Sequence, residues 1–338
     1  MKNVSFLFII LFYVAVASVS CSKKGDGTNP PATGNDTAAR MLNYSIKGVD
    51  AAVSFVQGHN QITIKFPDTI ISGENIIAKF TLSPGATATV NQINQVSGMS
   101  ANDYRTDVTY RITAADGITT SDWVVTGYNN DTCFNWGLGH FKGKQVDNDR
   151  PYNWYIDQGA TGAFSNVNCG PSSGAMSAKW SDAAFTGTAE DARNSYNTVG
   201  NLWYPATVST YLLQNNIPFK MLQDFTRPVD DDLKLLEKCL DNGNILIVML
   251  NTSAISHELL STQRVGKYYD FNFGHCIVLK GYVHVDGNRF FQVYDPWDWG
   301  AAYPEDHSPK GKDRFYREEE VMEGCLQNTN AAWQIFRK

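Results

Sequence analysis

The chain changes its pattern of hydrophobic residues once, near residue 128, and this change constrains the fold most. Before it, short alternations of apolar and polar residues at 61–66, 75–80 and 107–112 are separated by turn sequences. Beyond it, aromatic residues become dense, loops lengthen and helical patterns begin. A single core usually stops growing near about 250 residues. A chain of 338 residues with two patterns therefore predicts two domains.

Residues 40–128 are predicted to form an all-β sandwich, because their apolar residues alternate at a period of two and turn signals recur at sandwich spacing. The segment from Thr109 to Gly117, followed by Trp123 to Thr126, resembles the small immunoglobulin-like domains common in lipoproteins of Bacteroidetes. That resemblance implies an immunoglobulin-like sandwich. We expect no chemistry in it, since its only histidine, His59, lies in a Gly-His-Asn turn.

The N-terminus has the order of an export signal. Lys2 is followed by an unbroken apolar run at 6–17 and by small residues up to Cys21. The run is too short for a span of roughly 20 residues, so a retained transmembrane helix is disfavoured. The small residues before Cys21 resemble a bacterial lipobox, which implies cleavage before Cys21 and acylation of its thiol. An ordinary signal peptide is the alternative.

Residues 1–21 are thus predicted to be a lipoprotein signal, and residues 22–39 a flexible linker. The linker is built from Ser, Lys, Gly, Asp, Asn, Pro and Thr and cannot bury enough surface to offset its chain entropy. We expect an exported protein, anchored by lipid in the bacterial cell envelope at the outer membrane, with the membrane face undetermined. The formal net charge of −6 excludes nucleic acid as a main partner.

Spacing argues against a structural zinc site, because the chain has no Cys-x-x-Cys and no two histidines three to five residues apart. No metal or organic cofactor is expected. Export exposes thiols to oxidising conditions, but disulfide pairing cannot be assigned from sequence among Cys133, Cys239, Cys276 and Cys325.

Residues 129–338 are predicted to form one α+β domain. A helix should begin at Asp230 and end before Gly243, and the apolar run at 245–250 then predicts a buried strand. Strands at 276–282 and 289–294 form a hairpin whose turn, 283–288, contains Asp286-Gly287. His284 is expected in that turn, at the surface, and His140, His257 and His307 are also expected at the surface.

Cys169 is the first candidate for chemistry. It precedes Gly170-Pro171 and a run of small residues, and proline is tolerated in a first helical turn. Cys169 should therefore lie at a helix N-terminus, where the dipole and free N–H groups lower the pKa of a thiol. A buried structural cysteine is the alternative.

His275 and Asp295 are the second and third candidates. Residues equidistant from the turn of an antiparallel hairpin lie opposite each other, and the midpoint of 275 and 295 falls at residue 285. A carboxylate beside a histidine fixes its tautomer and supports the imidazolium. The alternatives are a core histidine and a turn-forming aspartate before Pro296.

Together these segments carry a second resemblance. Cys169-Gly170-Pro171, Gly274-His275 leading a strand to Gly281-Tyr282, and Val293 to Pro296 resemble papain-like peptidases of the bacteriocin-processing (double-glycine peptidase) type. The resemblance covers most of residues 150–300 and implies an α+β papain-like cysteine peptidase domain. It implies that Gln158 donates to the oxyanion together with the backbone N–H of Cys169. An exposed loop glutamine is the alternative.

The sequence therefore predicts a secreted, lipid-anchored cysteine peptidase that acts on a peptide or protein substrate through Cys169, His275 and Asp295. Peptidases of this type are usually fused to a membrane exporter, whereas this chain has no transporter segments. Two alternatives stay open, since fold does not set substrate. One is a cell-wall amidase or transpeptidase on the same scaffold, and the other is a catalytically silent surface protein that binds peptide or glycan.

Overall fold

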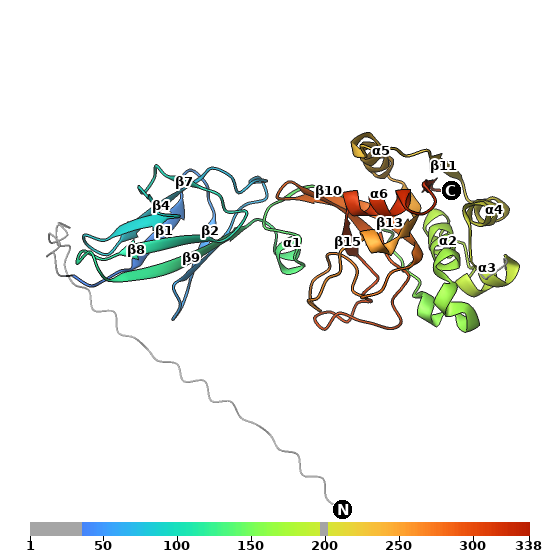
Figure 1. Cartoon of the computed structure of the whole chain (residues 1–338), viewed down its shortest axis with the longest axis horizontal. Coiled ribbons are helices and arrows are strands. Elements are labelled where there is room, and N and C mark those ends of the chain that lie inside the picture. Colours follow the sequence, from blue (N-terminus) through green and yellow to red (C-terminus); the bar gives the residue numbers. More distant parts are fainter. Residues whose placement is uncertain (1–35, 197–201) are drawn as a thin grey trace, which may run out of the picture.

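The computed structural model describes residues 36–196 and 202–338, which form two parts lying end to end along the longest axis of the molecule (Figure 1). The predicted signal, Cys21 and most of the predicted linker lie outside the described residues. Within the described residues, no helix is both long and apolar enough to cross a membrane.

The N-terminal part contains only β-structure, in two sheets that enclose one core. The larger sheet has the order β2-β3-β9-β8-β5-β6 and the smaller the order β1-β4-β7. Their strands are β1 (Met41–Ile46), β2 (Ala52–Val56), β3 (Gln61–Lys65), β4 (Ile76–Leu82), β5 (Thr87–Val90), β6 (Ile93–Asn94), β7 (Ala101–Asn102), β8 (Val108–Thr113) and β9 (Thr120–Tyr128). Alternation decides which residues are buried, as Ile62 and Ile64 of β3 show. The immunoglobulin-like character of this part stays a prediction.

A connecting segment joins the two parts after β9. It contains helix α1 (Asp131–Asn135) and strand β10 (Lys142–Asp147), which pairs with β13 of the C-terminal part. Phe141 is buried in the N-terminal core, while the carboxylate of Asp286 accepts hydrogen bonds from the backbone N–H groups of His140 at 2.6 Å and Phe141 at 2.9 Å. We call this pair of hydrogen bonds the Asp286 clasp.

The C-terminal part is built on one antiparallel sheet of seven strands. Six follow the order β11-β16-β12-β13-β14-β15, and β10 joins beside β13. The strands are β11 (Phe219–Gln223), β12 (Ile245–Asn251), β13 (Gly274–Val285), β14 (Asn288–Tyr294), β15 (Arg314–Arg317) and β16 (Ala331–Ile335). As the unbroken apolar run predicts, β12 is buried along residues 245–250, because helices cover both faces of the sheet.

Two groups of helices cover the two faces. Helices α2 (Cys169–Ser181), α3 (Ala189–Ser195) and α4 (Pro205–Gln214) enclose one core with Trp180 and Trp333, at the end of the molecule remote from the N-terminal part (Figure 1). Helices α5 (Asp230–Asp241) and α6 (Glu318–Leu326) enclose the other core. Helix α5 begins at Asp230 and ends before Gly243, whose φ of 75° suits a residue after a helix.

The hairpin corrects two expectations from the sequence. Strand β13 runs to Val285, so the turn is only Asp286-Gly287 and His284 lies within the strand. A register shift between Leu279 and Gly281 then brings Val278 opposite Tyr294. Asp295 therefore lies level with Ile277 and is a diagonal neighbour of His275 rather than its direct partner.

Candidate active site

Cys169 is the first residue of α2, and the surroundings of this helix hold it deep in the fold. Residues 170–178 are all buried, and a Cβ built on Gly170 would lie 2.7 Å from the Cβ of Trp203. Only small residues permit this approach. The first N–H groups of a helix have no partner within it, so those of Cys169 and Gly170 are free to face the thiol or a bound group.

Ser173 fixes the N-terminal end of α2 against the sheet. It lies one turn beyond Cys169 on the same helix face, and its Oγ donates to the carbonyl oxygen of Cys276 at 2.9 Å. Cys276 itself is buried in the core beneath α2. The start of α2 and the start of β13 are therefore joined directly, and this brings Cys169 beside His275.

Cys169 and His275 line one pocket with a volume of about 350 Å³. Its walls come from the loop before α2, from the segment leading into α4, from β12 and β13, and from the loop before β16. The lining residues are Asn166, Val167, Cys169, Leu202, Trp203, Tyr204, Pro205, Met249, Phe273, Gly274, His275, Cys276, Asn328 and Thr329. The thiol is only partly buried, so it is accessible to a molecule in the pocket.

Asp295 is fully buried and accepts hydrogen bonds from four groups. His275 Nε2 lies 2.6 Å from Oδ1, which also accepts the backbone N–H of Trp297 at 2.9 Å. The hydroxyls of Tyr316 and Tyr269 donate to Oδ2 at 2.5 and 3.1 Å. Burial alone would raise the pKa of Asp295, but His275 and these donors lower it below its usual value. Asp295 is therefore an anion that holds a proton on Nε2.

The hydrogen bond from Nε2 to Asp295 leaves Nδ1 as the nitrogen of His275 that can act on a group in the pocket. His275 Nδ1 is buried and has no hydrogen-bond partner among the described residues. Burial would lower the pKa of His275, but Asp295 and Cys169 raise it to about 10. Burial would likewise raise the pKa of Cys169, yet His275 and the N–H groups of Cys276 and Gly170 lower it. The two groups thus favour a thiolate beside an imidazolium.

The other described cysteines differ from Cys169 in this respect. No disulfide joins any of the five cysteines between residues 36 and 338 that the structure describes. Burial raises the pKa of the four thiols Cys133, Cys239, Cys276 and Cys325, to about 11 for Cys133 and about 12 for Cys325. Thiolate character is therefore favoured only at Cys169 in this set.

Arg193 is a site residue that sequence reasoning missed. Its Nε donates to Asn168 Oδ1 at 2.7 Å and its Nη2 to the Val167 carbonyl at 2.8 Å, so it supports the loop that enters α2. Burial lowers the pKa of this guanidinium, and the negative charge of Cys169 opposes that shift. Because Arg193 stands in a polar stretch of α3, its pattern is typical of a solvated helix face and gave no signal.

Gln158 does not line the pocket of Cys169 and His275. It is fully buried, which excludes the exposed-loop alternative, and it lies at the start of a short 3-10 helix, η1 (Gln158–Ala160). Its Nε2 donates to the Ser165 carbonyl at 2.8 Å, while its Oε1 has no hydrogen-bond partner among the described residues. An amide nitrogen carries two hydrogens, so one N–H of Gln158 is left for another acceptor.

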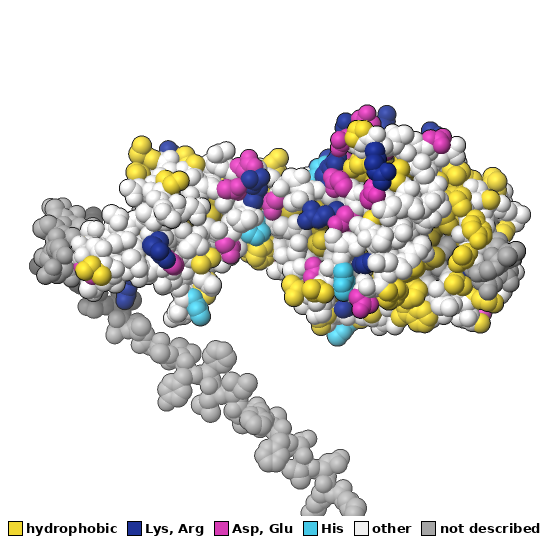
Figure 2. All heavy atoms as spheres, in the orientation of Figure 1, with side chains coloured by type: hydrophobic (Ala, Val, Ile, Leu, Met, Phe, Trp, Pro, Cys, Tyr) yellow, Lys and Arg dark blue, Asp and Glu magenta, His cyan; other side chains and the backbone are white. Residues whose placement is uncertain are grey.

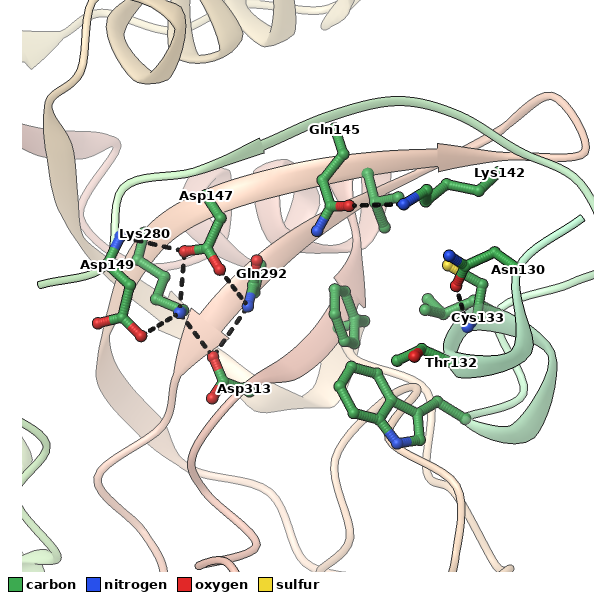
Figure 3. Close-up of a pocket in the computed structure, with 14 residues that line it drawn as sticks. Asn130, Thr132, Cys133, Lys142, Gln145, Asp147, Asp149, Lys280, Gln292 and Asp313 are labelled. Atoms are coloured by element: carbon green, nitrogen blue, oxygen red, sulfur yellow. Dashed lines mark hydrogen bonds and ion pairs between the residues drawn. The ribbon is translucent and has the colours of Figure 1, made fainter. Parts of the chain in front are cut away.

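A second pocket, of about 290 Å³, lies between α1 and the sheet (Figure 3). Cys169, His275 and Asp295 are not among its lining residues. Figure 3 shows Lys280 pointing toward three carboxylates, and its Nζ lies 2.9 Å from Asp147, 3.1 Å from Asp149 and 2.7 Å from Asp313. Cys133, on the opposite wall, has no histidine among the residues of this pocket. The arrangement is an ion-paired lysine rather than a nucleophile with a base.

Comparison of the sequence with known protein families gives one match. The model of the Peptidase_C39 like family matches residues 143–322, which is more than half of the chain and includes Cys169, His275 and Asp295. No curated protein matches the chain.

Three solved structures are similar to the chain at low identity. A protein of Bacillus anthracis assigned as a C39-like peptidase is 14% identical over 58% of this chain and 99% of its own, with a TM-score of 0.36. A protein of Bacteroides fragilis assigned as secreted is 17% identical over 27% and 94%, with a TM-score of 0.22. A protein of Bacteroides thetaiotaomicron assigned as a glycoside hydrolase is 15% identical over 92% and 91%, with a TM-score of 0.24. With TM-scores this low, none of them supports an argument about activity.

Proposed function

The chain belongs to the Peptidase_C39 like family, and on that premise we propose that it is a cysteine peptidase with Cys169 as nucleophile, His275 as general base and Asp295 as the carboxylate that orients the base. One observation carries the proposal. A thiol whose pKa is lowered and a histidine held by a buried aspartate line the same pocket. Nucleophile, base and orienting group in this order are what covalent acyl transfer needs.

The reaction follows from these positions. The Cys169 thiolate attacks the carbonyl carbon of the substrate, and the oxyanion that forms accepts a hydrogen bond from the Cys169 N–H. Gln158 does not line the pocket, and its unused N–H is the proposed second donor. The His275 imidazolium gives its proton to the leaving amine as the peptide bond breaks, which leaves a thioester. His275 then takes a proton from water, and the hydroxide releases the acid product and regenerates the thiolate.

The walls of the pocket favour an apolar substrate side chain near the bond that is cut. The pocket that holds the thiol is also lined by Leu202, Trp203, Tyr204, Met249 and Phe273, of which Tyr204 and Leu202 are exposed. Figure 2 shows hydrophobic side chains gathered at this end of the molecule, which also carries α2, α3 and α4. Apolar side chains gain free energy when such surfaces exclude water.

A cysteine-directed epoxide tests the nucleophile. At neutral pH the epoxide should label the native protein rapidly at one residue and should block hydrolysis of a peptide library in proportion to labelling, because a thiolate is the reactive form of cysteine. Cys169→Ala should remove both, while Cys133→Ala, which deletes a thiol whose pKa is raised, should leave both unchanged. If native protein and Cys169→Ala are labelled at the same rate, the peptidase proposal fails.

We propose further that the protein is exported and lipid-anchored through Cys21. The basis is the apolar run followed by small residues and Cys21 in the sequence alone. Labelling of bacteria with a palmitate analogue should mark the native protein and not Cys21→Ala, which should also leave the membrane fraction. Equal incorporation of the analogue into both proteins would exclude Cys21 as the acylated residue.

A further inference from the structure

Three side chains that can bind metal converge on the face of the sheet covered by α5 and α6. Glu237 comes from α5, His284 from β13, and Glu318 is the first residue of α6. Their ligand atoms all lie within 4.8 Å of one another, and His284 Nε2 lies 3.0 Å from a carboxylate oxygen of Glu237. The three are far apart in sequence, so only the fold brings them together.

Glu318 is the member of this group that calls for a partner. Its side chain is 0% exposed, and neither of its oxygens accepts a hydrogen bond from a described residue. The cation beside it is Arg289, whose Nε is 3.7 Å from Oε2, while Arg289 Nη2 bonds to Glu319 at 2.7 Å. A buried carboxyl group without hydrogen-bond donors is costly, and a cation bound against it would remove that cost.

We propose that Glu237, His284 and Glu318 form a binding site for a divalent transition-metal ion, with Zn²⁺ as the best fit. One imidazole nitrogen with two carboxylates suits zinc better than calcium or magnesium, which prefer oxygen ligands throughout. Ligands of tetrahedral zinc lie about 3.4 Å apart, given bonds of about 2.0 to 2.2 Å. Small movements of the glutamate side chains close the present spacing to that value.

The position of the proposed metal site lets an ion enter from solvent and indicates what a bound ion would do. The side chains of His284 and Glu237 are 28% and 15% exposed, so an ion can enter from solvent, and water can occupy the fourth position. The ion would join α5 and the start of α6 to the hairpin. His284 is nine residues from His275 along β13, about 30 Å at the usual rise of a strand. A bound ion should therefore affect the stability of the protein rather than the proposed hydrolysis.

Zinc titration of metal-stripped protein tests the site. The whole chain should carry Cys169→Ala in every sample, because a thiolate beside a histidine also binds zinc. Calorimetry with ZnCl₂ should show one saturable site, and the ion should raise the melting temperature. His284→Ala and Glu318→Gln should each weaken binding by at least about 10- to 100-fold, as loss of even a supporting group does. His257→Ala, which removes an exposed histidine, should bind zinc as the parent does.

The same samples decide between a lost site and a lost fold. Without metal, Glu318→Gln should melt close to its parent, because glutamine keeps the side-chain volume and replaces a buried carboxyl group that has no hydrogen-bond donor, yet it should lose the rise in melting temperature caused by zinc. Absence of saturable binding to the parent, or binding that neither variant weakens, would overturn the proposal. So would calcium that binds equally well and displaces the zinc, because His284 would then have no part as a ligand.

Discussion

His275→Ala is expected to slow peptide hydrolysis by about four orders of magnitude or more, the range found when one member of a nucleophile and base pair is removed. Two losses combine in this variant. The base that moves protons to the leaving amine and from water is gone, and so is the positive charge that lowers the pKa of Cys169. Burial, which raises the pKa of a thiol, then acts with less opposition.

The second loss can be measured separately from turnover. The rate of epoxide labelling of Cys169, followed against pH, should show its thiol ionising at higher pH in His275→Ala than in the native protein. His275→Gln, which keeps more of the side-chain volume, should behave in the same way if charge rather than packing is responsible. His59→Ala, in an exposed turn of the N-terminal part, is the matched control. Unchanged labelling against pH would contradict the pairing of the two residues.

Asp295→Asn is expected to lower kcat/KM by about 10²- to 10⁴-fold and to change its pH dependence. Asp295 accepts from four donors, and an amide can replace only one of its two oxygens. The hydroxyls of Tyr269 and Tyr316 would then face an N–H₂ group that cannot accept their protons. The imidazole would be held less firmly, and the imidazolium would lose the adjacent negative charge.

The direction of the pH effect follows from the same contacts. In the proposed mechanism His275 must be protonated beside the thiolate, so native activity should persist at rising pH and fall only near the His275 pKa of about 10. Asp295 is the largest influence that raises this pKa, against burial, which lowers it. In Asp295→Asn the alkaline fall of kcat/KM should therefore move to lower pH. Asp147→Asn, in the second pocket, should leave it in place, and an unmoved alkaline limb in Asp295→Asn would rule out the orienting role.

Much of the fold could be predicted wherever a signal is local. The helix beginning at Asp230 has an acidic first turn and a glycine after its end, and β12 is an unbroken apolar run. Each of these is decided by residues within a few positions. The alternating strands of the N-terminal part were predictable for the same reason, since burial follows residue parity along each strand.

The register of the β13–β14 hairpin could not be predicted, because it depends on a third strand. A Cβ on Gly281 would overlap the Val146 carbonyl oxygen, so β10 passes against the bulge in β13. Nothing near Gly281 in the sequence indicates that approach. Equal distance from the turn predicts His275 directly opposite Asp295. In the structure Asp295 lies level with Ile277, two positions away along β13, and is still within hydrogen-bond reach of His275.

The residues of the candidate site also fall into those that a local sequence pattern marks and those that only the fold brings together. Sequence motifs predict Cys169, His275 and Asp295, because the neighbours of these residues in the sequence carry the pattern. Arg193, Tyr269 and Tyr316 act through contacts between separate segments, and no local pattern marks them. The sequence predicts His284 in a turn, and it is the extension of β13 to Val285 that places His284 beside Glu237 and Glu318.

Strand β13 also fixes the spacing between the candidate site and the connecting segment. His275 lies near its start, and Asp286, whose clasp holds the connecting segment, directly follows its end. Successive side chains of a strand alternate between faces, so adding or deleting one residue between these two positions would turn one of them away from its target. Insertions or deletions between His275 and Asp286 are therefore restricted to pairs of residues or need a compensating bulge. The candidate site and its attachment to the N-terminal part cannot evolve independently.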